Sequence, residues 1–177
     1  MACIVLGITG SIAAYKAADI ASALVKKGHE VHCVCTEKAL DFVTPMTLKT
    51  ISRNEVVTDA EPGDGWVPTH IRLAQKADLL LIAPASAHTI AKLAHGFAPD
   101  LLSSLYLATR ATVLICPAMN GQMWSHPATM SNVEVLKTRS NHYIFGPAKE
   151  GVLACGDEGA GKLMPVTEIV EETLKYL

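Results

Sequence analysis

The sequence has no block of basic residues and almost no net charge. Its 15 Lys and Arg residues stand against 17 Asp and Glu residues, and the formal net charge is −2. A protein that grips a nucleic-acid backbone needs a concentrated basic surface. The composition therefore argues against nucleic acid as a partner. The chain also shows no internal repeat and no low-complexity tract.

The sequence also lacks the pattern of a signal peptide or of a membrane helix at residues 1–7. The apolar stretch at residues 1–7 has no basic residue before it and is interrupted by Gly7. A signal peptide begins with positive charge, and a membrane helix needs about 20 apolar residues. We therefore expect a buried strand at residues 2–8, a cytoplasmic protein and no membrane contact.

Cysteines are few, and their number is odd. Of the five, Cys155 stands in a glycine-rich segment and the others lie largely in apolar runs. An odd number argues against a disulfide framework. We expect four small core residues and treat Cys155 as a candidate reactive thiol.

Apolar runs of strand length alternate along the chain with segments of helical periodicity. The runs lie at residues 2–8, 31–35, 79–83, 112–116 and 142–145, with a shorter sixth candidate at 56–57. Residues 11–27 have apolar positions at helical spacing, and Gly28 is a typical helix stop. This alternation predicts an α/β fold with a three-layer, doubly wound parallel sheet of about six strands, Rossmann- or flavodoxin-like. We expect a single domain at residues 1–177.

Two turns that follow predicted strands suit an anion. Gly10, Ser11 and Ile12 follow the first strand, and residues 86–89 follow the strand at 79–83. Backbone N–H groups at a helix start attract negative charge, but Ser11 and Ser86 also suit ordinary helix caps. Neither turn matches the dinucleotide or Walker fingerprint. Thr36 adds a hydroxyl after the second strand, and three converging turns favour a phosphorylated ligand.

Further along the chain, single polar residues suggest chemistry without defining it. The amide of Asn120 offers a donor and an acceptor, which suits a carboxylate, whereas Met123 and Trp124 in the same loop are expected in the core. His70 at a predicted helix start is either a cap or surface residue or a proton-transfer group. No other ligand lies at metal-binding spacing from it, so no metal site is expected. Residues 151–162 form either a flap or an ordinary loop.

Three longer motifs carry a resemblance to a known family. They are Gly-Ser-Ile-Ala-Ala-Tyr-Lys at 10–16, Pro-Ala-Ser-Ala-His-Thr at 84–89 and Pro-x-Met-Asn-x-x-Met-Trp at 117–124. Together they resemble the homo-oligomeric flavin-containing cysteine decarboxylases, over nearly the whole chain. The resemblance implies FMN as cofactor, in contact with Gly10, Ser11, Ile12, Thr36, Ser86, Ala87, His88, Thr89 and Ala118. His88 departs from the family's asparagine.

The same resemblance implies a role for each candidate residue. His70 would act as base, Asn120 would hold the substrate carboxylate, and Cys155 would donate a proton. Substrate contacts would come from Met119, Asn120, Ala154 and Lys162. The implied reaction is FMN-dependent decarboxylation of 4′-phosphopantothenoylcysteine to 4′-phosphopantetheine on the route to coenzyme A. The flavin is needed because no amino-acid side chain can serve as the electron sink.

The implied partners and the rival functions follow from the same family. The flavin is expected between subunits of a homo-oligomer, a trimer or a trimer-based dodecamer, and a synthetase is expected as a fused domain or separate partner. A peptidyl-cysteine decarboxylase of the lantibiotic type stops at the ene-thiol, and Cys155 favours the reducing enzyme instead. A non-catalytic flavin-binding regulatory subunit can dispense with His70, Asn120 and Cys155, all of which are present.

Overall fold

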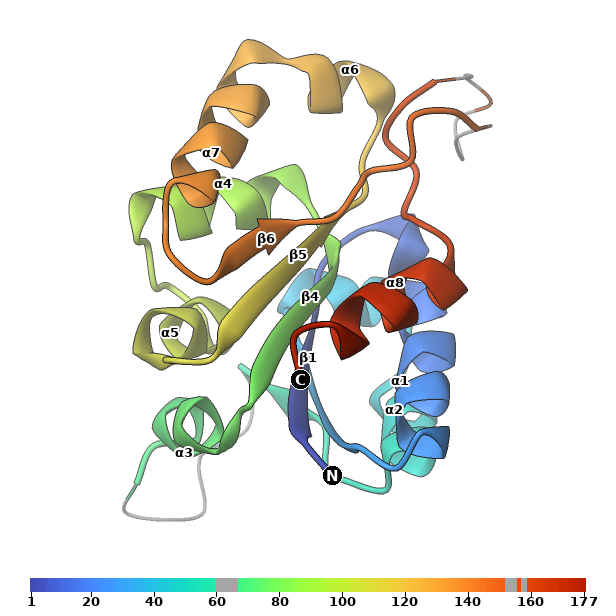
Figure 1. The fold of residues 1–177 in the computed structure, drawn as a ribbon, viewed down its shortest axis with the longest axis vertical. Coiled ribbons are helices and arrows are strands. Elements are labelled where there is room, and N and C mark those ends of the chain that lie inside the picture. The colour runs from blue at the N-terminus through green and yellow to red at the C-terminus, as the bar shows by residue number, and fades with distance from the viewer. Residues whose placement is uncertain (60–66, 152–155, 157–158) are drawn as a thin grey trace.

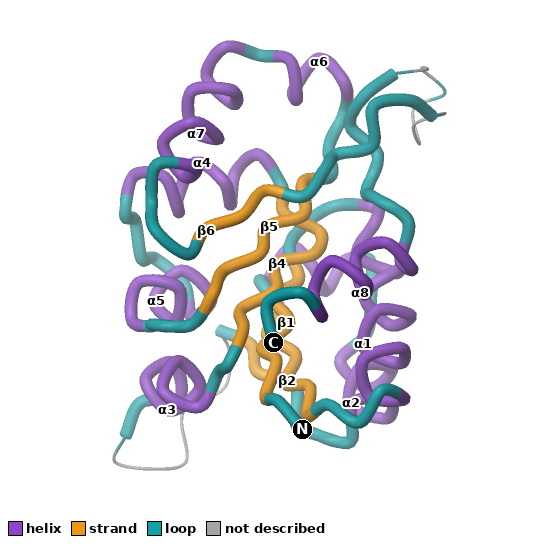
Figure 2. The backbone as a smooth tube through the Cα atoms, viewed as in Figure 1, coloured by secondary structure: helices purple, strands orange, loops and turns teal. Residues whose placement is uncertain are grey.

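A six-stranded parallel sheet forms the middle layer of the computed structural model, which describes residues 1–59, 67–151, 156 and 159–177. The strand order is β3-β2-β1-β4-β5-β6 (Figures 1 and 2). The direction of winding reverses between β1 and β4, which is the doubly wound Rossmann arrangement. This confirms the predicted fold class. The strands are β1 Cys3–Ile8, β2 Glu30–Cys35, β3 Val57–Thr58, β4 Leu79–Ala85, β5 Thr112–Pro117 and β6 His142–Ile144.

Helices cover both faces of the sheet (Figure 1). One face packs against α1 (Ala17–Lys26), α2 (Pro45–Ser52) and α8 (Val166–Leu174). The other packs against α3 (Thr69–Lys76), α4 (Ala87–His95), α5 (Leu101–Ala108) and α7 (Pro127–Lys137). Three short helices lie in the connections, and they are η1 (Ile12–Lys16), η2 (Glu37–Asp41) and α6 (Gly121–Ser125).

The central strands supply side chains to both cores in alternation. Along β1, Ile4 and Leu6 join the core beneath α1, whereas Val5 joins the core beneath α4 and α5. Every residue of β1 and β4 is buried. A parallel sheet covered on both faces requires this, and it explains why these strands are continuous apolar runs in the sequence.

The cysteines behave as the sequence predicts wherever the structure describes them. Cys3, Cys33, Cys35 and Cys116 are buried and free of disulfides. Burial raises the pKa of the Cys33 and Cys35 thiols to about 12, so both stay protonated. Cys155 lies outside the described residues.

Some expectations needed correction. The helix predicted at residues 11–27 begins as the 3-10 turn η1 before α1 takes over. Strand β4 continues two residues beyond the predicted end, through Pro84 to Ala85. Met123 is half exposed rather than in the core, while Trp124 is partly buried against the α4 side.

Among the described residues no helix is long and apolar enough to cross a bilayer.

Candidate active site

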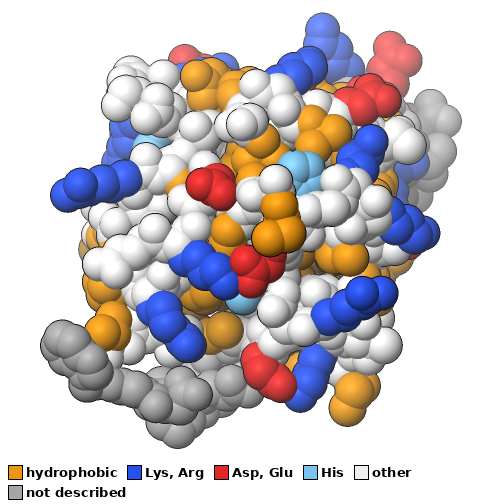
Figure 3. Space-filling view, turned by 60° about the horizontal axis from the view of Figure 1, so that its bottom comes forward, with side chains coloured by type: hydrophobic (Ala, Val, Ile, Leu, Met, Phe, Trp, Pro, Cys, Tyr) orange, Lys and Arg blue, Asp and Glu red, His pale blue; other side chains and the backbone are white. Residues whose placement is uncertain are grey.

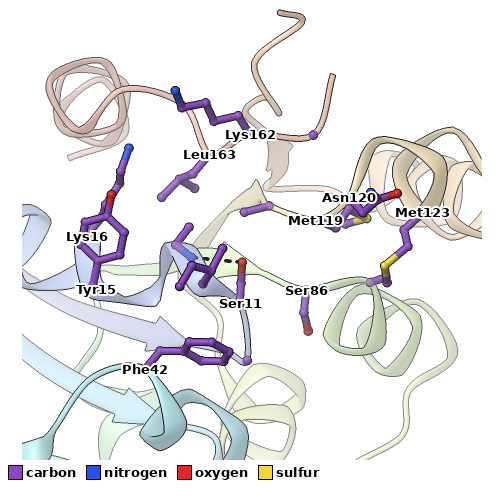
Figure 4. A pocket seen from close by; sticks show the side chains of 16 residues that line it. Ser11, Tyr15, Lys16, Phe42, Ser86, Met119, Asn120, Met123, Lys162 and Leu163 are labelled. Carbon is purple, nitrogen blue, oxygen red and sulfur yellow. Dashed lines mark hydrogen bonds between the residues drawn. The ribbon is translucent and has the colours of Figure 1, made fainter. Parts of the chain in front are cut away.

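A cavity of about 580 Å³ opens where β1, β4 and β5 end. Its walls come from the turns after these strands, from Phe42 and from residues 161–163 (Figure 4). In the close-up, Lys16, Lys162 and Leu163 lie on one side and Met119, Asn120 and Met123 on the other. The volume falls in the range of small-molecule sites. The cavity sits at the point where the strand order reverses, as expected for a ligand site in this fold.

The first wall is the turn between β1 and η1. Ser11 has extended backbone angles and its Oγ accepts the N–H of Ala13 at 3.3 Å, so it is the N-cap of the helix. Gly10 packs tightly against η2, since a Cβ there would lie 2.6 Å from Cβ of Lys38. The helix start is thereby held with its N–H groups toward the cavity end of the sheet.

The second wall is the turn between β4 and α4. Ser86 caps α4, and its Oγ accepts the N–H of Thr89 at 3.3 Å. Thr89 is buried inside the helix start, and His88 is exposed beside it. Ser86 and Ala87 line the cavity.

Thr9 ties the first two walls together. Its fully buried hydroxyl donates to the carbonyl oxygen of Pro84 at 2.8 Å and accepts the N–H of Ser86 at 2.9 Å. One side chain thus fixes the spacing between the turns that carry Ser11 and Ser86. The sequence analysis did not identify Thr9, although a hydroxyl directly after a buried strand, like that of Thr36, is a signal of this kind.

We expect Thr9→Val to loosen both turns. Valine keeps the shape but leaves the N–H of Ser86 and the carbonyl of Pro84 without this partner, a loss of about 1–3 kcal/mol in the free energy of unfolding. Denaturant titration and the bound-ligand content of the purified protein measure the effect. Thr173→Val is the matched control, because this buried hydroxyl donates only to a helix carbonyl, that of Ile169. Equal losses in both variants would contradict the bridging role.

The third wall is the loop from Ala118 to Met123 after β5. The Oδ1 of Asn120 accepts the N–H of Gln122 at 2.8 Å and caps α6. Ala118 donates its N–H to the carbonyl of Ala85 at 3.0 Å, which joins this loop to the second wall. At the base of the loop, burial raises the pKa of the Cys116 thiol, so this cysteine stays neutral.

The fourth wall consists of residues 161–163, and Gly161 brings it against the Asn120 loop. Its carbonyl accepts the N–H of Met119 at 2.9 Å. Its φ is +134°, and a Cβ would lie 2.4 Å from the carbonyl oxygen of Met119. Only glycine allows both the backbone angle and the close approach. This contact carries Lys162 and Leu163 to the edge of the cavity.

Gly161→Ala should therefore separate these two walls. We expect a loss of about 1–3 kcal/mol from overpacking, beyond the cost of the backbone angle itself. Gly159→Ala is the control that measures the cost of the backbone angle alone, because the φ of Gly159 is +149° and a Cβ there would meet nothing within 4 Å. Thermal unfolding of both variants gives the comparison. Similar stability of the two variants would show that the contact with Met119 is not needed.

The charge of the cavity favours an anion. Lys16 and Lys162 line it, and no Asp or Glu does so among the residues that the structure describes. Two helix starts with serine caps add partial positive charge at the same place. The rest of the lining is largely apolar, with Ile12, Tyr15 and Phe42 partly exposed at 54%, 55% and 41%. The site suits an amphipathic ligand with an anionic end.

The structure brings together most but not all of the predicted site residues. Nine of the predicted site residues line the cavity, and they are Gly10, Ser11, Ile12, Ser86, Ala87, Ala118, Met119, Asn120 and Lys162. Thr36, His88 and Thr89 do not line it in the single chain; the hydroxyl of Thr36 donates to the carbonyl of Ile8 at 3.4 Å. Ala154 and Cys155 lie outside the described residues.

His70 is a predicted catalytic residue that the structure places apart from the cavity. It is the second residue of α3, is partly buried and does not line the cavity. Helix α3 packs beside α5, on the opposite face of the sheet from α1 and α8 (Figure 1). A single chain therefore does not place His70 beside Asn120.

Comparison with protein-family models shows which family the chain belongs to. The family model described as Flavoprotein matches residues 2–177. The chain belongs to the Flavoprotein family. A probable phosphopantothenoylcysteine decarboxylase of Streptococcus mutans serotype c is 44% identical to it over 177 residues, 98% of each chain. The coenzyme A biosynthesis bifunctional protein CoaBC of Bacillus subtilis is 42% identical, over 98% of this chain but 42% of its own length.

Three solved structures share the fold over 99% of this chain. A cysteine-to-serine mutant of PPC decarboxylase, complexed with pantothenoylaminoethenethiol, superposes with a TM-score of 0.86 at 29% identity, covering 99% of this chain and 97% of that one. The FMN-dependent cysteine decarboxylase SpaF gives the same TM-score at 30% identity and the same coverage. The FMN-binding protein AtHal3 gives 0.83 at 29%, covering 99% and 96%.

Proposed function

We propose that this chain is an FMN-dependent decarboxylase that converts 4′-phosphopantothenoylcysteine to 4′-phosphopantetheine, a step toward coenzyme A. Residues 1–177 would form one flavin-binding domain acting in the cytoplasm. The observation that carries the proposal is the cavity at the strand-order reversal, where two serine-capped turns meet the Asn120 loop. The Streptococcus relative, which this chain matches over 98% of its length, supports the substrate.

The described residues fit FMN. Ser11 and Ser86 in the lining suit the flavin phosphate, and the apolar side chains of Ile12, Phe42 and Met123 suit a planar ring. When bound, the flavin supplies the reversible electron sink that cleavage of a carbon–carbon bond beside the cysteine sulfur requires. We propose that Thr36, His88 and Thr89 also contribute to this site, with His88 in place of the family's asparagine.

Asn120 is proposed to bind the substrate carboxylate. Its Oδ1 accepts the N–H of Gln122 at 2.8 Å, which fixes the orientation of the amide. The other end of the amide is a donor, the polarity that a carboxylate requires. Met119, Ala154 and Lys162 would add substrate contacts, with Lys162 offering positive charge to the substrate phosphate.

His70 is proposed to complete the cavity of a neighbouring copy. It belongs to α3 and does not line the cavity of its own chain. The exposed apolar side chains of Ile12, Tyr15 and Phe42 at the cavity give a second copy a surface to cover. A heterologous contact forms a ring when its rotation closes, and we propose a trimer or a dodecamer built from trimers. The imidazole would take the proton released at the cysteine.

Cys155 is proposed as the proton donor in the last step. Decarboxylation leaves an unsaturated thiol, which needs a hydride and a proton to become the saturated product. The solved cysteine-to-serine mutant of PPC decarboxylase holds pantothenoylaminoethenethiol, a thiol of this unsaturated type. That complex supports a cysteine in the reducing step and favours this function over peptidyl-cysteine oxidation.

A synthetase is proposed as a partner or fused domain. The chain spans about two fifths of the bifunctional relatives, 41–43% of their length. We propose that the remaining part of those bifunctional relatives corresponds to the synthetase.

Direct assay tests the proposal. The purified yellow protein is incubated with 4′-phosphopantothenoylcysteine or with a peptide that ends in cysteine, and carbon dioxide and the thiol product are measured by mass spectrometry. We expect carbon dioxide and a saturated thiol from the first substrate alone. Turnover of the peptide alone would indicate a peptidyl-cysteine decarboxylase. A yellow protein that turns over neither would indicate a regulatory flavoprotein.

A further inference from the structure

A mixed cluster of Cys3, Glu30 and His32 lies at the amino-terminal end of the sheet, opposite the cavity. Parallel pairing of β1 and β2 places Cys3 beside Glu30 and Val5 beside His32. Because alternate residues of a strand face the same side, the three side chains share the face that α3 covers. Figure 3 turns this end toward the viewer, and acidic, basic and histidine side chains adjoin one another there. The sequence hides the cluster, since only the strand register joins residues so far apart.

The geometry is close to that of a metal site. One ligand atom from each residue lies within 4.8 Å of the others, and Nε2 of His32 is 2.9 Å from Oε1 of Glu30. Around a tetrahedral zinc ion, ligand atoms are separated by roughly 3.3–3.7 Å, as its bond lengths require. Small side-chain rotations would bring the three atoms to these separations.

A cation already occupies the position between two of the ligands. The Nζ of Lys76 donates to Oε1 of Glu30 at 2.6 Å and lies 3.1 Å from Nε2 of His32. The Lys76 side chain is 44% exposed, whereas that of His32 is 15% exposed. The lysine can therefore turn into solvent, while the ligands remain held by the sheet. The cluster is arranged around positive charge.

We propose that Cys3, Glu30 and His32 form a binding site for a divalent zinc ion. Thiolate, imidazole and carboxylate are the donors that zinc takes, with a water in the fourth position. Burial, with a further contribution from the Glu30 carboxylate, raises the pKa of the Cys3 thiol to about 11. Binding consequently releases the thiol proton to solvent as the sulfur–zinc bond forms, and Lys76 leaves. This site does not depend on the proposed decarboxylase function.

Zinc and cobalt titrations of the reduced, untagged flavoprotein test the site. We expect one zinc ion per chain by competition with a chromophoric chelator, and a thiolate-to-cobalt absorption band with Co²⁺. Each of Cys3→Ser and His32→Gln removes one ligand and should lower the zinc affinity by roughly tenfold or more. Cys3→Ser should also abolish the cobalt band. His95→Gln, which removes a histidine paired with Asn132 elsewhere, should change neither.

Lys76→Met gives the sharper result. If the ammonium competes for the site, its removal should tighten zinc binding by about tenfold, whereas a simple surface lysine would have no effect. Circular dichroism and flavin content show that each variant is folded. Zinc binding that is equal in wild type, Cys3→Ser and His32→Gln, or absent from wild type and Lys76→Met, would overturn the proposal.

Discussion

Replacing His70 with glutamine is expected to lower kcat/KM for 4′-phosphopantothenoylcysteine by about 10²–10⁴, the usual worth of a general base. Glutamine keeps the size and polarity of the side chain but cannot take a proton. Flavin content and thermal stability should stay close to wild type, because glutamine fills the place of the imidazole and the proposed phosphate-binding turns at Ser11 and Ser86 are unchanged. Steady-state release of carbon dioxide and the flavin absorption spectrum measure the two effects.

A mixing experiment then tests where His70 acts. His70→Gln and Asn120→Ala are each expected to be inactive alone. If a site takes His70 from one copy and Asn120 from its neighbour, co-expression should restore about a quarter of the sites, because each needed residue is present in half of the copies. If both residues came from one chain, no mixed oligomer would contain a complete site. Absence of recovery in verified mixed oligomers would therefore contradict the shared site. His95→Gln is the histidine control.

The fold follows from the sequence because its strands are buried on both faces. The runs at 2–8 and 79–83 contain no polar or charged side chain, as expected of strands in a parallel sheet between two helical layers. The end of β4 was harder to predict. The apolar run predicts an end at Ala83, and Pro84 lacks the N–H that a regular ladder needs. Pairing nevertheless resumes between Ala85 and Pro117, after a register shift between Ile82 and Ala85.

The candidate site was predictable where it depends on local sequence. Ser11 and Ser86 are helix caps that begin turns, and a cap is a property of the residues beside it. The link made by Thr9 is different, because it joins residues 77 apart in the chain. Gly161 likewise owes its importance to the Met119 carbonyl, a partner far away in the sequence. His70 and the cavity lie apart in one chain, and the proposed shared site depends on a second copy, which no local pattern in the sequence describes.

Replacing Cys155 with serine is expected to change the product rather than stop the reaction. Oxidation at the cysteine and loss of carbon dioxide precede the step that needs the proton, so carbon dioxide release should persist. Serine is a far weaker acid than cysteine, and formation of the saturated thiol should fall by about 10²-fold or more. The unsaturated thiol, two hydrogen atoms lighter, should accumulate in the mass spectrum.

The control for this exchange is Cys3→Ser, at the opposite end of the sheet from the cavity. It makes the same chemical change and should leave the ratio of saturated to unsaturated product as in wild type. Saturated product from Cys155→Ser at the wild-type rate would show that another acid supplies the proton. Loss of carbon dioxide release in that variant would instead place Cys155 before the carbon–carbon cleavage, and the order of steps proposed for this chain would have to change.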